Sequence, residues 1–111
     1  MGRINSKNKG VAYELAIIKE MKSLFKTDNI HSTRSKNRDL DNQKVDICGD
    51  IPFNIQAKRT ESIPQVHKIF DEINRDKSPL IFWKKNYKPT LVIMEVETFL
   101  KIMLDNESKK D

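Results

Sequence analysis

The chain has 111 residues, a formal net charge of +5 and an isoelectric point near 9.4. This length is enough for one domain whose core needs no disulfide or structural metal, and we expect a single domain over residues 1–111. The only cysteine, Cys48, excludes an internal disulfide framework and a multi-cysteine zinc site, and it favours a reducing, cytoplasmic compartment. No apolar run is long enough to span a membrane, so we expect no membrane association, and the positive charge suits a polyanionic partner.

Basic side chains gather in two segments of the first half of the chain. One is the polar N-terminus, residues 1–8, which we expect to be a flexible basic arm; the other runs from residue 32 to 42, which we expect to contain a mobile loop. Such residues either keep the surface soluble or contact phosphates, and their clustering favours phosphate contact. The candidates are Arg3, Lys7, Lys9, Arg34, Lys36 and Arg38.

The first periodic segment predicts an amphipathic helix over Lys9–Lys26. Its apolar stripe, at spacings of three and four, consists of Val11, Leu15, Ile18, Met21 and Phe25. Glu14 falls inside this stripe, on the side that should face a sheet, where an unpaired carboxylate is costly. It either lies on the flank of the helix and pairs with a neighbour such as Lys7, or it is a ligand or orients one.

A short strand is predicted next, at residues 30–34, followed by a polar loop at residues 35–42 and then two strands around a turn within residues 45–58. Apolar and polar residues alternate through this hairpin. The apolar set is Val45, Ile47, Phe53, Ile55 and Ala57, and the polar set is Asp46, Gln56 and Lys58. Both sets keep to one face each only if the loop has an odd number of residues, so we expect a connection of three or five.

An acid, an amide oxygen and a lysine on one sheet face indicate metal-dependent phosphodiester chemistry. The alternative for Lys58 is a solvated strand lysine that neutralises Asp46. Other aspartates compete for the metal role; they are Asp39, Asp41 and Asp50, which we interpret as solvated, paired or turn residues. His31 and His67 are weaker candidates for general-base chemistry.

The remaining elements are a second helix, two buried strands and a closing helix. Ser62 is the expected N-cap of the second helix, with Pro64 in its first turn and its end near residue 76. The strands are expected at residues 80–83 and 91–94, the last helix around residues 99–103, and a disordered tail at residues 106–111. A helix crossover between two of the strands implies an α/β fold with a mixed sheet flanked by helices.

An acid in the first helix, an aspartate on one strand and a residue-x-lysine on the next resemble the PD-(D/E)xK nuclease superfamily. The small size, the Lys9-Gly10 and Tyr13-Glu14 opening and the basic arm are most similar to archaeal Hjc-type and phage Holliday junction resolvases. The resemblance covers residues 9–94 and implies a restriction-endonuclease-like αβββαβ core. The superfamily also contains restriction enzymes, exonucleases and transposon end-cleaving subunits, so the fold alone does not identify the function.

The resemblance implies a Mg²⁺ site, which Mn²⁺ can also fill, made by Glu14, Asp46, Gln56 and the backbone carbonyl of Ala57. Lys58 would orient the attacking water. Ser32 and Ser35 join the candidates for DNA contact. Symmetric cutting of a four-way DNA junction would require a homodimer, for which residues 80–83 and 91–96 are either the dimer patch or, as we expect, interior strands.

Gln56 stands where the family usually has Glu or Asp, and a neutral oxygen attracts Mg²⁺ less than a carboxylate does. Three hypotheses follow: a junction resolvase, another nuclease of the superfamily, and a DNA-binding module with a decayed site.

Overall fold

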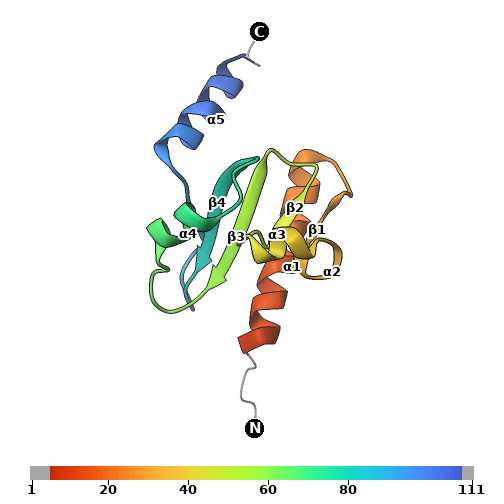
Figure 1. Cartoon of the computed structure of the whole chain (residues 1–111), viewed down its shortest axis with the longest axis vertical. Helices are drawn as coiled ribbons and strands as arrows, with labels where there is room; N and C mark the ends of the chain where they lie inside the picture. The colour runs from red at the N-terminus through yellow and green to blue at the C-terminus, as the bar shows by residue number, and fades with distance from the viewer. Residues whose placement is uncertain (1–5, 109–111) are drawn as a thin grey trace.

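A five-stranded mixed sheet forms the centre of the computed structural model, which describes residues 6–108 (Figure 1). The elements are α1 (Ser6–Phe25), β1 (Ile30–Ser32), α2 (Thr33–Lys36), α3 (Arg38–Asn42), β2 (Ile47–Gly49), β3 (Phe53–Arg59), α4 (Val66–Glu72), β4 (Ser78–Lys84), β5 (Leu91–Ile93) and α5 (Val96–Ser108). The strands follow one another in chain order, β1-β2-β3-β4-β5. Only β3 and β4 run parallel, joined by the α4 crossover, which confirms the predicted α/β class and mixed sheet.

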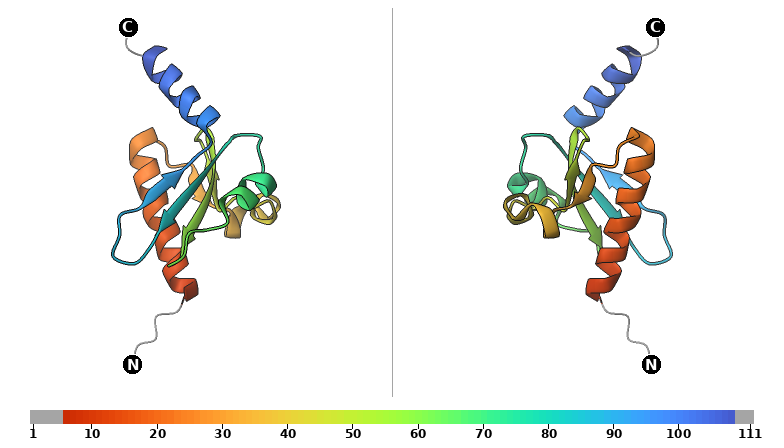
Figure 2. Two further views of the ribbon diagram at one scale, coloured as in Figure 1. Left: turned by 90° about the vertical axis from the view of Figure 1, so that its left-hand side faces the viewer. Right: turned by 90° about the vertical axis from the view of Figure 1, so that its right-hand side faces the viewer.

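Helices cover both faces of the sheet (Figure 2). On one face α1 packs against apolar side chains of the central strands; the buried members of this core include Tyr13, Ile17, Ile47, Ile55 and Phe82. On the other face α4 closes a second core, which includes Val45, Cys48, Ile69, Phe70 and Ile81. A strand buried on both faces needs apolar residues at successive positions, as Leu80, Ile81 and Phe82 of β4 show. The expectation that residues 80–83 are interior therefore holds for these three.

The loop between β2 and β3 consists of residues 50–52, which confirms the predicted three-residue connection. Gly49 has a φ of +142°, and a Cβ there would lie 2.1 Å from the carbonyl oxygen of Asn29, so glycine is required where the turn passes β1. Ile47 pairs with Ile55.

The predicted alternation fails at one residue, Val45. It packs in the core beneath α4, whereas Ile47 packs in the core beneath α1. Lys44 has a positive φ of 66° and the regular strand begins only at Ile47, so the two-residue period does not extend back to Val45.

Four element boundaries also differ from expectation. Residues 35–42, expected as a loop, contain the second half of α2 and all of α3, because the side chains of Ser32 and Asn37 accept hydrogen bonds from the first turns of these helices. Ser62 does not cap the second helix, which begins at Val66 without a side-chain cap. Residues 6–8 of the expected arm belong to α1, and residues 106–108 of the expected tail belong to α5. The remaining arm and tail residues, 1–5 and 109–111, lie outside the described range.

The last helix, α5, extends away from the sheet, as all views show (Figures 1 and 2). Its apolar residues are largely exposed, in contrast to those of α1. They are Val96, Phe99, Leu100, Met103 and Leu104. Within residues 6–108, no helix combines the length and hydropathy that crossing a bilayer requires.

Candidate functional site

Asp46 lies just before β2 and beside the middle of β3. Its Oδ2 atom accepts a hydrogen bond from Nε2 of Gln56 and another from the backbone N–H of Ala57, both at 2.9 Å. The Asp46 N–H in turn donates to the carbonyl oxygen of Ile55. The hairpin therefore brings together Asp46 and Gln56, as the alternation predicted.

The carboxyl group of Asp46 sits in an environment that disfavours its charge. The pKa of Asp46 is raised to about 6, mainly by burial and also by repulsion from Glu14, while the hydrogen bond from Ala57 and the charges of Lys58 and Arg34 act in the opposite direction. The two carboxylates are thus close enough to repel one another. A cation between them would relieve both the burial cost and the repulsion.

Glu14 reaches this place from α1 and is only 4% exposed. Its Oε2 atom lies 2.8 Å from Nη2 of Arg34, and the hydroxyl of Ser32 lies 3.4 Å from Oε1. Glu14 is therefore buried rather than on the flank of the helix, and its charge partner is Arg34. Ser32 and Arg34, predicted as DNA contacts, belong to the site itself.

Gln56 is buried, and its two amide atoms differ in their surroundings. The nitrogen donates to Asp46, whereas Oε1 has no hydrogen-bond partner within residues 6–108. Leaving a buried acceptor unpaired costs about 1–3 kcal/mol. An unsatisfied oxygen beside a destabilised carboxylate fits a metal ligand, because hard divalent cations bind carboxylate and amide oxygens.

Lys58 lies two residues further along β3 and is partly buried. Its charge lowers the pKa of Asp46, yet among the described residues it forms no ion pair within 4.0 Å. The alternative of a strand lysine that neutralises Asp46 therefore stays open, with Lys58 acting on Asp46 at a distance and not as an ion-pair partner within 4.0 Å. Gln56 and Lys58 line a cavity of about 370 Å³ between β3 and α4, whereas Asp46 and Glu14 are not among its lining residues.

Thr33 is a site residue that the sequence analysis missed. It is completely buried, its hydroxyl donates to the carbonyl oxygen of Val45 at 2.6 Å, and its N–H donates to that of Asp46 at 2.9 Å. Thr33 thus fixes the backbone from which the Asp46 side chain projects. The sequence analysis placed Thr33 inside the strand predicted at residues 30–34, whereas β1 ends at Ser32, so its position after the strand could not be recognised.

The competing residues lie elsewhere. Asp50 is in the turn, where its carboxylate accepts a hydrogen bond from Thr27, and Asp41 lies 3.2 Å from the Thr33 hydroxyl. Nε2 of His31 is 3.5 Å from the sulfur of Cys48. Asp39 and His67 are exposed. In the part of the chain that the structure describes, no three His, Cys, Asp or Glu residues form a metal-binding group, so the candidate centre depends on Gln56.

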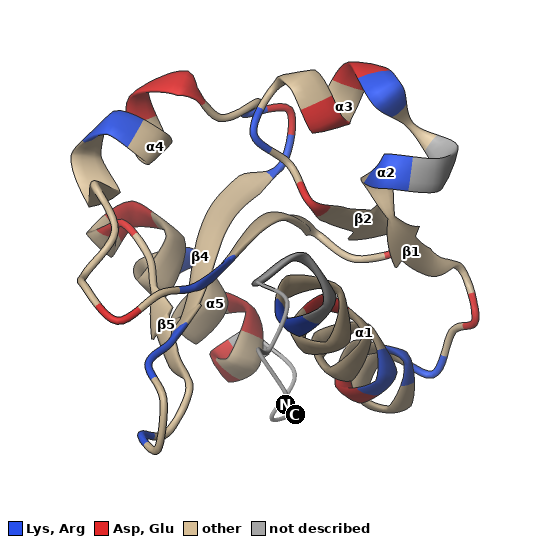
Figure 3. Cartoon of the chain, turned by 90° about the horizontal axis from the view of Figure 1, so that it is seen from below, with Lys and Arg blue, Asp and Glu red and all other residues tan. Residues whose placement is uncertain are grey.

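The other predicted DNA contacts are spread around the site. Arg38 is exposed on α3, and Lys9 lies in the first turn of α1, where its Nζ atom donates to Oδ1 of Asn86. Basic residues of α1 and α2 are visible on the side viewed from the N-terminal end of α1 (Figure 3). Arg3 lies outside the described residues, as do the side chains of three further candidates, Lys7, Ser35 and Lys36.

The comparisons with known proteins add no assignment. No family model, no curated protein and no solved structure matches this chain.

Proposed function

We propose that this protein is a Mg²⁺-dependent endonuclease that hydrolyses phosphodiester bonds in DNA, with a restriction-endonuclease-like core. The observation that carries the proposal is the contact between Asp46 and Gln56, in which a partly buried carboxylate with a raised pKa binds the nitrogen of an amide whose oxygen has no partner among the described residues. Buried groups held in an unfavourable state cluster at functional sites.

The order of elements supports the proposal. α1, the three strands β1, β2 and β3, the crossover α4 and the parallel strand β4 follow one another as αβββαβ, interrupted only by the short α2 and α3. The four residues that the motif would supply, Glu14, Asp46, Gln56 and Lys58, come from α1, the start of β2 and β3.

Each residue has a role that its surroundings suggest. Asp46, Glu14 and Gln56 Oε1 would hold the cation, together with the Ala57 carbonyl, whose own peptide N–H already binds Asp46. A bound Mg²⁺ supplies Lewis acidity that offsets charge on the phosphoryl oxygens. Lys58, without an ion-pair partner among the described side chains, would orient the attacking water and stabilise developing negative charge. Arg34, whose side chain is 42% exposed, can bind a phosphate while holding Glu14 in place.

The four-way junction is the substrate we propose first, and it requires two sites related by a dyad. Residues 91, 92 and 96, part of the segment considered for a dimer patch, are exposed, so the expectation that this segment is interior is wrong for these three. The more extensive apolar surface is on α5, where positions 96, 99, 100, 103 and 104 recur at helical spacing and form one exposed stripe. Such a stripe on a projecting helix suits pairing with the same helix of a second copy.

The test is cleavage of labelled four-way junctions and matched linear duplex in Mg²⁺ or Mn²⁺. We expect symmetric nicks in the junction that are lost in Asp46→Asn and in Lys58→Ala, by at least about 10²-fold. Asp50→Asn makes the same chemical change at an exposed turn residue and should leave cleavage unaltered, as should Lys85→Ala. Equal cutting of linear duplex would reject the resolvase in favour of another nuclease of the superfamily. Cleavage that survives Asp46→Asn would show that Asp46 is not part of the active site.

The second candidate is a DNA-binding module without activity, which the neutral Gln56 favours. It predicts binding of the junction without cleavage in either metal. The Gln56→Glu variant separates the two, because it should restore cleavage to a decayed site.

The dimer has its own test. Sedimentation of wild-type protein should give a dimer, and Leu100→Asp together with Leu104→Asp should give a folded monomer that still binds Mn²⁺ but no longer cuts a junction symmetrically. A wild-type monomer that makes paired cuts would contradict the α5 interface.

A further inference from the structure

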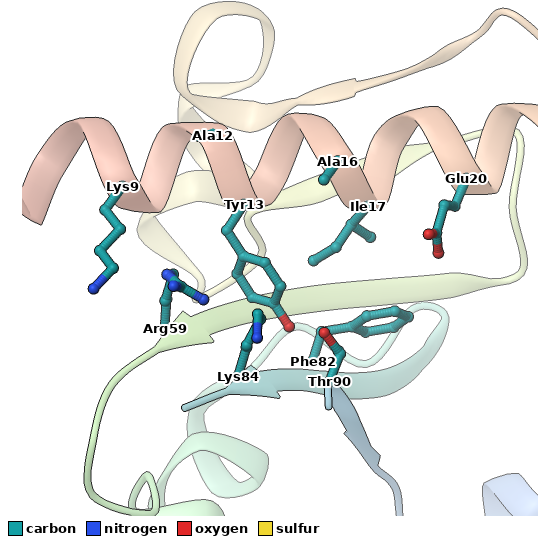
Figure 4. A pocket seen from close by; sticks show the side chains of 10 residues that line it. All are labelled: Lys9, Ala12, Tyr13, Ala16, Ile17, Glu20, Arg59, Phe82, Lys84 and Thr90. Carbon is teal, nitrogen blue, oxygen red and sulfur yellow. The ribbon is translucent and has the colours of Figure 1, made fainter. Parts of the chain in front are cut away.

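A second cavity, of about 500 Å³, lies between α1 and the ends of β3 and β4 (Figure 4). It opens on the face of the sheet that α1 covers, whereas Gln56 and Lys58 border the cavity beside α4. Among its lining residues, only Lys9 and Tyr13 were singled out by the sequence. Its volume falls within the range of small-molecule sites and is larger than a lone phosphate needs.

Three cations line this cavity, and two of them share one acceptor at the end where α1 begins. Lys9 and Arg59 both donate to the side-chain oxygen of Asn86, at 2.7 and 3.1 Å, and Lys84 donates to the carbonyl oxygen of Lys88. Among the described residues none of the three is paired with a carboxylate within 4.0 Å. Glu61, the acid in contact with Asn86, binds the Asn86 backbone N–H instead. Because these positive side chains have only neutral hydrogen-bond acceptors, this part of the cavity is suited to binding an anion.

Tyr13 supplies the second observation. Its side chain is 8% exposed, and within residues 6–108 its buried hydroxyl has no hydrogen-bond partner. The hydroxyl points into the cavity near Thr90, without reaching hydrogen-bonding geometry (Figure 4). Burial raises the pKa of the Tyr13 hydroxyl, with the nearby Thr90 side chain acting in the opposite direction, so the hydroxyl keeps its proton at neutral pH and can donate it to a ligand.

The opposite end of the cavity has the opposite charge. Glu20 lies on α1 three turns beyond Lys9, and its carboxylate borders the cavity (Figure 4). Between them Ala12 and Ala16 leave room beside Ile17, which makes an apolar wall. The cavity thus has a cationic part, an apolar wall beside the Tyr13 hydroxyl, and an acidic end.

We propose that this cavity binds a nucleotide unit, either free or as part of a DNA strand. The phosphate lies on Lys9, Arg59 and Lys84, and the base lies along the Ala12 and Ala16 surface. Glu20 accepts a hydrogen bond from an exocyclic amine of the base. Adenine and cytosine carry such an amine and thymine does not, so the site prefers dAMP to dTMP. The site is separate from the metal centre and does not depend on its activity.

The test is calorimetric titration of the full chain in EDTA with dAMP, dTMP, deoxyadenosine and inorganic phosphate. We expect dAMP to bind most tightly, with a loss of about tenfold for deoxyadenosine, since a charged contact is worth about one such factor. Arg59→Gln should weaken dAMP by a similar factor, and Lys19→Gln, the same charge change on the exposed face of α1, should leave it unchanged. Tyr13→Phe should cost about fivefold without loss of the folded state, which thermal unfolding checks.

Two comparisons locate the base and the source of the nucleotide. Glu20→Gln should reduce the preference for dAMP over dTMP, and a short single strand with a 5′ phosphate should be compared with the same strand lacking it. Preference for the phosphorylated strand assigns the cavity to a strand end, and equal binding assigns it to an internal unit. Binding to inorganic phosphate as tight as to dAMP, or dAMP binding unchanged by Arg59→Gln, would overturn the proposal. Asp46→Asn should bind dAMP normally, so a failed cleavage assay leaves this test intact.

Discussion

Asn54 and Gln56 lie two residues apart on β3, both are buried amides, and their environments differ. Nδ2 of Asn54 donates to the carbonyl oxygen of Asn74 at 2.9 Å and to Oδ1 of Asp76 at 2.7 Å, both in the segment after α4. Gln56 binds Asp46 through its nitrogen and leaves its oxygen without a partner in the described structure. Asn54 therefore connects the segment after α4 to β3 through hydrogen bonds.

The comparison shows that burial of a polar side chain is not in itself a functional signal. Asn54 is 1% exposed, even less than Gln56, yet its hydrogen bonds account for its burial. At Gln56 the unpaired acceptor coincides with a carboxylate whose pKa is raised to about 6. It is this coincidence that favours a cation site at Gln56 and a structural role at Asn54.

Replacing the two amides by apolar residues of similar size should give the largest difference in stability. Asn54→Leu removes hydrogen bonds to two acceptors, one of them a carboxylate, and should lower the free energy of unfolding by about 2 kcal/mol, whereas Gln56→Met removes one hydrogen bond and should cost about 1 kcal/mol. Urea denaturation in EDTA measures both. The order should reverse for cleavage, where Gln56→Met should be the more damaging, and equal stability losses would contradict the contrast.

The pH dependence of stability sharpens the role of Asp46. Its pKa rises from 3.8 to about 6 on folding, so the folded state binds more protons between these values and the metal-free protein should become more stable as the pH falls from 6 toward 4. The contribution of Asp46 is at most about 3 kcal/mol, present in full below pH 4 and lost as the pH rises through 6. Asp46→Asn should remove this part of the pH profile. Identical profiles for the two proteins would show that Asp46 is not destabilised.

Thr33→Val tests whether Thr33 holds the backbone segment from which the Asp46 side chain projects. The substitution keeps the shape of the side chain but leaves the Val45 carbonyl oxygen without its buried donor, which should cost about 1–2 kcal/mol. If Thr33 positions Asp46, Thr33→Ser should retain both stability and Mn²⁺ affinity better than Thr33→Val. A Thr33→Val protein with wild-type Mn²⁺ affinity would assign Thr33 to stability alone.

Gln56→Glu should have the smallest effect on the fold and a clear one on metal. A second carboxylate beside Asp46 should lower metal-free stability at pH 8 by about 1 kcal/mol and raise affinity for Mg²⁺, since a charged oxygen attracts a hard cation more strongly. Thermal unfolding with and without Mg²⁺ measures both. We expect cleavage to hold or increase, and a decrease would show that the neutral ligand is adapted to this site.

The features predicted correctly from sequence were those set by regular periodicity. The alternation in residues 45–58 was enough to predict the loop length and the contact of Asp46 with Gln56, and Glu14 stood out because it interrupts an apolar stripe. Leu15, assigned to that stripe, is exposed instead. The helix turns a slightly different face to the sheet, with Tyr13 and Ile17 at its centre.

Features set by local capping or by distant contacts were not predictable in this way. The helices within residues 33–42 begin at side-chain caps and carry no apolar period, and the positive φ of Lys44 moves Val45 to the other face. The pairing of Arg34 with Glu14 joins residues 20 positions apart, which no local pattern specifies. The Thr33 hydroxyl binds a backbone carbonyl oxygen of Val45, a contact that no sequence motif indicates.

The contrast between Gln56 and Asn54 is tested most directly by calorimetric titration of the protein with Mn²⁺ at pH 7.5. We predict saturable binding that is abolished by Asp46→Asn, weakened by Gln56→Met, and unchanged by Asp50→Asn. Binding that persists in Asp46→Asn with wild-type affinity, or the absence of saturable binding to the wild-type protein, would contradict a metal centre at Asp46 and Gln56.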